Sequence, residues 1–126
     1  MTSRADDIWY RLADAETRTT LQALPADLRE RAAGLPILLE DRPSRAVIED
    51  GWPDDLLGLF EGPAYGEAAA AADFTPPAIR LFVGNLRAET GDDPTAFRQE
   101  VRTTLLHEIG HYLGLNEDDL VARQLD

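Results

Sequence analysis

The sequence predicts one folded domain of mixed class, in which helices and short strands both occur. Apolar residues recur with helical spacing near the N-terminus and again from about residue 94 to residue 113. Three short apolar runs, each bounded by glycine or proline, lie between these stretches. The chain of 126 residues, with a hydrophobic fraction of 44%, fits a single domain over residues 1–126 whose active site is a shallow groove.

The N-terminal segment, from about Ala5 to Arg31, is predicted to be helical. Pro25 is suited to the start of a second helix after a bend, and Gly34 to the end of that helix. The apolar residues that recur at steps of three and four are Ile8, Trp9, Leu12, Leu21, Leu24 and Leu28.

The three apolar runs predict strands at about residues 35–40, 56–60 and 79–83. Residues 41–55 are expected to form turns, because two prolines and a glycine interrupt them. Residues 66–77 contain an alanine run followed by two prolines, which indicates a surface loop or a short helical turn.

A long helix is predicted from Pro94 to Leu113. Asp93 is the expected N-cap, and Gly114 is expected to end the helix in a left-handed conformation. A last short helix is expected over about residues 117–125, with Asn116 as its cap.

The composition excludes several classes of function. With 24 acidic and 12 basic residues, the formal charge of the chain is -12. Nucleic acids and anionic membranes are not expected as partners, because the negative charge of the protein repels them. The absence of cysteine removes disulfides and thiolate ligands, so any metal site must use His, Asp or Glu. No apolar run is long enough to span a bilayer and the first residues do not form a signal peptide, so a cytoplasmic location is expected. The oligomeric state stays open.

Both histidines of the chain lie in His107-Glu-Ile-Gly-His111, which fits the pattern H-E-x-x-H. Residues four apart on a helix sit one above the other, so both imidazoles can bind one metal ion while Glu108 acts on a water molecule beside it. The two histidines lie away from the apolar stripe of the helix. That stripe consists of Phe97, Val101, Leu105, Ile109 and Leu113.

The alternative interpretation is an accidental match between two ordinary polar-face histidines and the motif. The capped helix, the position of the histidines off the apolar stripe, and Gly114 three residues after His111 all favour a metal site. A catalytic zinc ion usually takes three protein ligands. Metzincins use a third histidine and a downstream methionine, but the chain has Glu117 at that position and its only methionine is Met1. Glu117 is also the sole glutamate after His111.

Residues 101–120 (VRTTLLHEIGHYLGLNEDDL) resemble the minimal zincin family, small metallopeptidases with the motif H-E-x-x-H-x-x-G-x-x-D. Weaker similarity extends upstream through LPILLEDRP, DDLLGLFEG and PPAIRLFVG. The resemblance implies an α+β zincin-like fold with a small mixed sheet, one zinc ion bound by His107 and His111, Glu108 as catalytic base, and a third ligand at position 117.

Glu117 stands where the family typically has aspartate. Glutamate is one methylene longer than aspartate. Either Glu117 therefore binds the zinc ion with a shifted backbone, or Asp118, Asp119 or a water molecule takes the third position. We expect Glu117 to be the ligand. For Asp118 and Asp119, interaction with the positive end of the last helix is the better explanation.

These observations predict a zinc-dependent metallopeptidase that acts on a peptide or protein, preferably basic or neutral. Residues 79–83 are expected to pair with an extended peptide if they form the sheet edge. The alternatives are a noncatalytic zinc-binding or protein-interaction module and an acidic helical adaptor without metal. Tyr65, Arg80 and Tyr112 can each stabilise an oxyanion, but a packed aromatic or a surface charge is the favoured role for each.

Overall fold

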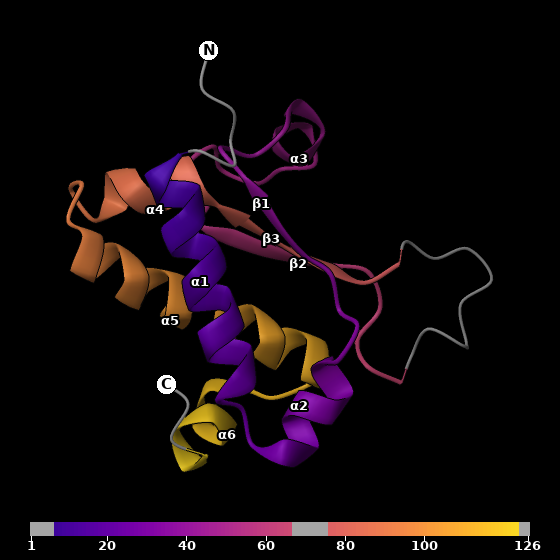
Figure 1. The fold of residues 1–126 in the computed structure, drawn as a ribbon. Helices are drawn as coiled ribbons and strands as arrows, with labels where there is room; N and C mark the ends of the chain where they lie inside the picture. Colours follow the sequence, from indigo (N-terminus) through magenta and orange to yellow (C-terminus); the bar gives the residue numbers. More distant parts are fainter. Residues whose placement is uncertain (1–6, 67–75, 124–126) are drawn as a thin grey trace.

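The computed structural model describes residues 7–66 and 76–123, and their fold is α+β, as expected (Figure 1). The described elements are α1 (Ile8–Gln22), α2 (Ala26–Ala32), β1 (Ile37–Glu40), α3 (Arg45–Glu49), β2 (Gly58–Glu61), β3 (Ala78–Phe82), α4 (Val83–Glu89), α5 (Pro94–Leu113) and α6 (Glu117–Ala122).

The three strands form one mixed sheet in the order β1-β3-β2. β1 pairs parallel to β3, and β2 pairs antiparallel to it. Pairing of residues 79–83 with a peptide requires a place at the sheet edge, and this condition is not met, because β3 has a partner on each side. Position along the chain does not determine position in a sheet. β2, which lies beside α5, is the edge strand that matters for the site.

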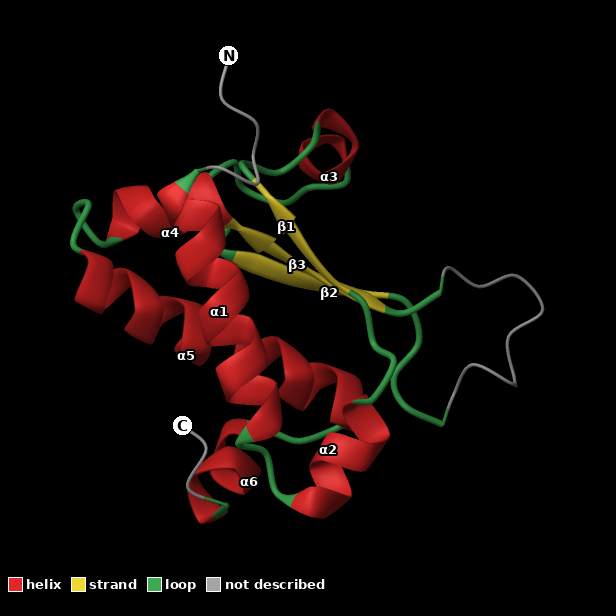
Figure 2. Ribbon diagram, viewed as in Figure 1, coloured by secondary structure: helices red, strands yellow, loops and turns green. Residues whose placement is uncertain are grey.

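The helices α1, α4 and α5 lie on one side of the sheet (Figure 2). The side chains of Ile79 and Leu81 point from β3 into this layer and are fully buried. α5 is the central element, because it packs against α1, α2, α4, α6, β2 and β3. α3 covers part of the opposite face, where Val47 packs against Leu59 and Phe82.

The bend in the N-terminal helical segment is confirmed, since α1 ends before Pro25 and α2 follows it. Asp7 caps α1 by accepting a hydrogen bond from the backbone of Trp9. The predicted start at Ala5 lies outside the described residues, as does most of the predicted loop over residues 66–77.

The sequence did not predict α3 or α4. α3 is only five residues long, too short for a periodic pattern, and lies in the segment expected to form turns, where Ser44 caps it. α4 begins at Val83, directly after β3, so the predicted strand ends one residue too late. Gly84 permits this junction, because a Cβ atom there would lie 2.2 Å from Oδ1 of Asp41. Glycine alone fits so close to another chain segment.

Both predicted ends of α5 are confirmed. The Asp93 side chain accepts hydrogen bonds from the backbone of Thr95 and Ala96, and Gly114 ends the helix with φ of 73°. Asn116 caps α6 as expected, although α6 ends at Ala122. No helix of the described residues is both long and apolar enough to cross a membrane.

Candidate metal centre

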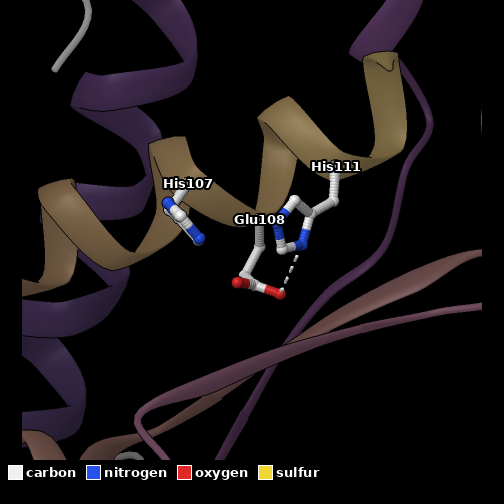
Figure 3. Close-up of side chains that lie close together, drawn as sticks. All are labelled: His107, Glu108 and His111. Atoms are coloured by element: carbon white, nitrogen blue, oxygen red, sulfur yellow. Dashed lines mark ion pairs between the residues drawn. The ribbon is translucent and has the colours of Figure 1, made fainter. Parts of the chain in front are cut away.

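His107, Glu108 and His111 project from α5 on the same side, with the carboxylate between the two imidazoles (Figure 3). One ligand atom from each residue lies within 4.8 Å of those of the other two. The imidazole ring centroids of His107 and His111 are 4.7 Å apart. The helical spacing of the motif therefore brings three potential metal ligands together.

The two histidines are accessible, whereas the glutamate is not. The side chains of His107 and His111 are 45% and 54% exposed, while that of Glu108 is 11% exposed. The histidines lie off the buried face of α5, as expected. This face is wider than the apolar stripe, because Thr104 and Gly110 are buried on it as well. The neighbouring elements β2 and α6 cover these two residues, which the sequence pattern does not show.

Glu108 is held by the edge strand β2. The backbone N–H of Phe60 donates a hydrogen bond of 2.9 Å to Oε1 of Glu108, and the same oxygen lies 3.6 Å from Nδ1 of His111. The amide of Phe60 therefore points away from β3 and toward the motif. A buried carboxylate needs such a donor, because burial without one is costly.

β2 approaches α5 this closely because residue 58 is glycine. A Cβ atom at Gly58 would lie 2.7 Å from Cγ2 of Thr104, closer than real side chains allow. Sequence analysis did not identify Gly58 or Phe60 as site residues. The signal was weak, since a glycine inside a predicted strand indicates only a close approach of some other segment.

The turn after α5 brings Glu117 back toward the motif. The Leu115 N–H donates a hydrogen bond of 2.7 Å to the carbonyl of Gly110, and Leu120 of α6 packs against the same glycine. Oε1 of Glu117 then lies 3.7 Å from Nδ1 of His107. Glu117 is 82% exposed and is not part of the close group formed by His107, Glu108 and His111.

The other two acidic residues of α6 differ from Glu117. Asp119 completes a capping box, since its carboxylate accepts from the Asn116 N–H at 2.9 Å and its own N–H donates to the Asn116 side chain at 2.8 Å. Asp118 is exposed in the first helical turn. Asp119 lies at the positive end of α6, as expected, and the capping box, which the sequence did not predict, engages its carboxylate with the Asn116 N–H.

The three other candidates have structural partners. Arg80 forms ion pairs with Glu40 and Glu61 on the two flanking strands. The Tyr112 ring packs edge-on against the ring of Phe60, and against the ring of Tyr65, whose N–H donates to the Tyr112 carbonyl. Arg80 and Tyr112 therefore have ion-pair or packing partners, and Tyr65, which is 52% exposed, contacts the Tyr112 ring.

Two hollows flank the histidines. The larger, here named the β2–α5 groove, has a volume of about 480 Å³. A smaller hollow of about 270 Å³ lies toward α6 and is lined by both histidines, Asn116 and Glu117. The β2–α5 groove is lined by Trp52, Leu56, Leu57, Gly58, Leu59, Phe60, Glu100, Thr103, Thr104, His107, Glu108 and His111.

The donor set fits zinc, which proteins bind through imidazole nitrogen and carboxylate oxygen. A family model described as zincin-like metallopeptidase matches residues 32–126. The chain belongs to the zincin-like metallopeptidases. No curated protein matches the chain. For a zincin-like metallopeptidase the expected metal is zinc, and His107, Glu108 and His111 lie close enough together to bind a metal ion.

Proposed function

We propose that this zincin-like metallopeptidase hydrolyses peptide bonds, with His107 and His111 as zinc ligands and Glu108 as general base. The observation that carries this proposal is the position of Glu108. Its carboxylate lies beside both imidazoles, faces an open groove, and is held by a backbone N–H from the edge strand. A purely structural metal site has no use for a carboxylate positioned in this way.

A bound zinc ion supplies Lewis acidity, which activates water and polarises the carbonyl of the substrate. Glu108 accepts the proton of the attacking water and delivers it to the leaving amine. Its low exposure and its hydrogen bond to Phe60 limit the side chain to few rotamers, so the proton acceptor is already oriented.

Glu117 is our proposed third ligand. Its carboxylate lies beside His107 and lines the smaller hollow together with both histidines. Because its side chain is mostly exposed, a change of rotamer toward the histidines costs little. Asp119 is less suitable, because its carboxylate already accepts the Asn116 N–H.

The substrate is proposed to be an extended peptide that pairs with the outward-facing backbone groups of β2 other than the Phe60 N–H, which already donates to Glu108. An edge strand offers unpaired backbone groups, and peptides bind such edges by adding a strand. With a net charge of -12, we propose that nucleic acids and anionic membranes are not partners of this chain.

The first test measures bound zinc and peptide cleavage in protein purified without a histidine tag. Wild type is expected to hold about one zinc ion per chain and to cut a peptide library. Glu108→Gln should keep the zinc and lose cleavage, since it removes only the proton acceptor, whereas His111→Ala should lose both. Wild type that binds no added zinc would contradict the metal site. Wild type that binds zinc but cuts no peptide would favour a noncatalytic module.

The second test compares Glu117→Ala with Asp118→Ala. Replacing a residue that only hydrogen-bonds to a metal ligand typically weakens metal binding by about tenfold to a hundredfold. Removing a direct ligand should weaken zinc binding by at least this factor. Asp118→Ala removes the same charge one residue away and should leave the affinity nearly unchanged. Competition with a zinc-chelating dye measures both. Equal affinities in the two variants would assign the third position to another group.

A further inference from the structure

We propose that Glu100 makes this peptidase selective for substrates with lysine or arginine on the C-terminal side of the scissile bond. This inference rests on the proposed function and names the substrate class of the same site. It follows from the course of the β2–α5 groove, from the chemistry of its lining, and from the direction of β2.

The groove extends from the metal site along α5 toward the start of the helix. Glu100 precedes His107 by two helical turns, so both lie on the same face of α5, and both line the groove. Oε1 of Glu100 accepts a hydrogen bond from the Thr104 hydroxyl at 3.4 Å. A substrate held at the metal site therefore reaches Glu100 within a few residues.

The groove lining has an apolar part and a polar part, and the polar part consists of Glu100, Thr103, Thr104, Glu108 and the two histidines. Trp52, Leu56 and Leu57 form the apolar part, and Trp52 is 43% exposed. Among the described residues that line the groove there is no arginine, so Glu100 has no cationic partner there. Lysine and arginine side chains combine an apolar stem with a charged head, which matches the apolar part of the lining together with the carboxylate of Glu100. The net charge of -12 also attracts such peptides over longer distances.

The direction of β2 decides which side of the substrate meets Glu100. Gly58 lies against Thr104, and Phe60 packs against Tyr112 two turns later, so β2 and α5 run in the same direction along the groove. A peptide that pairs antiparallel to β2, the more stable arrangement, runs the opposite way. Its C-terminal part then passes Gly58 and approaches Glu100.

The test uses zinc-loaded protein and two series of short peptides. In one series the first residue after the cleaved bond is varied, and in the other the second residue is varied. With lysine or arginine there, kcat/KM should exceed that of the leucine peptide by about tenfold, as for a hydrogen bond between charged groups. Glu100→Gln should abolish this preference, and Glu100→Arg should reverse it in favour of glutamate. Glu89→Gln is the matched control, because it removes the same charge from an exposed position outside the groove, and it should keep the preference.

A binding measurement separates this proposal from the proposed catalysis. In a Glu108→Gln background the lysine peptide should bind about tenfold more tightly than the leucine peptide by fluorescence anisotropy, and adding Glu100→Gln should remove the difference. If wild type cuts no peptide but this difference is found, the catalytic proposal fails and the role of Glu100 stands. Equal binding of the two peptides, a preference unchanged in Glu100→Gln, or a preference on the N-terminal side would each overturn the selectivity proposal.

Discussion

At the scale of single residues, the position of the Glu108 carboxylate depends on two uncharged groups of β2. They are Gly58, which has no side chain, and the backbone amide of Phe60. Gly58 lets the edge strand β2 approach α5, and the backbone amide of Phe60 then reaches the carboxylate of Glu108. Neither residue carries chemistry of its own. Together they hold the buried carboxylate of Glu108 in one position beside the two histidines. Adding a single methyl group at position 58 tests this effect.

Gly58→Ala should lower the free energy of unfolding by about 1–3 kcal/mol, the usual cost of inserting a methyl group into a packed region. The added Cβ atom would meet Cγ2 of Thr104 at 2.7 Å, so β2 must move away from α5. Because this movement lengthens the hydrogen bond between Phe60 and Glu108, peptide cleavage should fall as well. Urea denaturation measures the change in stability.

Thr104→Ser provides the matching control, since it removes the clashing methyl group and keeps the hydroxyl. The double variant Gly58→Ala/Thr104→Ser should recover most of the stability lost in Gly58→Ala. A double-mutant cycle detects this coupling. If the two effects simply add, the clash with Thr104 is not the cause of the loss.

At the scale of elements, α2 and α6 are joined by an ion pair on the outside of the helical layer. Arg123, which follows α6, lies 3.1 Å from Oδ2 of Asp27 in α2. Desolvation raises the pKa of the Asp27 carboxyl, but the hydrogen bond and the positive charge of Arg123, together with the backbone hydrogen bonds of Leu28 and Asp27, outweigh it, so the pKa lies below its ordinary value of 3.8. The folded state therefore favours the ionised carboxylate.

This shift predicts a dependence of stability on pH. A carboxyl whose pKa is lowered by folding stabilises the protein at pH values above 3.8, and this contribution disappears as the pH falls through the lowered pKa. Arg123→Gln should return the pKa of Asp27 toward 3.8, measured by NMR titration of the carboxyl. Its unfolding free energy should be below that of wild type at neutral pH and should approach it in acid.

Arg98→Gln is the control for this prediction, because it removes a positive charge from an exposed position on α5. The pKa of Asp27 should be the same in Arg98→Gln as in wild type. An equal rise of the pKa in both variants would mean that total charge, and not the contact with Arg123, is responsible.

At the scale of the whole molecule, zinc binding should stabilise the entire fold. The proposed ligands His107 and His111 lie on α5, which packs against four other helices and two strands, so unfolding of α5 disrupts most of the core. Free zinc at 100 times its dissociation constant should raise the free energy of unfolding by about 2.7 kcal/mol, provided that the unfolded chain does not bind it. Thermal denaturation with and without zinc measures this effect.

His111→Ala tests whether the stabilisation comes from this site. Added zinc should leave its melting temperature unchanged, and a chelator should lower the melting temperature of zinc-loaded wild type only. An equal rise in wild type and His111→Ala would place the stabilising zinc elsewhere on the acidic surface.

The sequence alone predicted those features that depend on neighbours along the chain. Asp93, Pro94 and Gly114 delimit α5 through local hydrogen bonds and backbone conformation, and four-residue spacing brings His107 and His111 together. The family resemblance is confirmed by the family model that matches residues 32–126.

Only the tertiary structure decided which strand borders the site. The sequence left the place of residues 79–83 in the sheet open, and in the structure β3 is central while β2 lies at the edge beside α5. The bond between Phe60 and Glu108 and the approach of Gly58 to Thr104 both join residues more than forty positions apart, and the strand order also depends on pairing between distant segments. Periodicity and capping report local preferences, whereas such pairings depend on how complete elements pack, and this is why the residues that line the groove could not be predicted from the sequence.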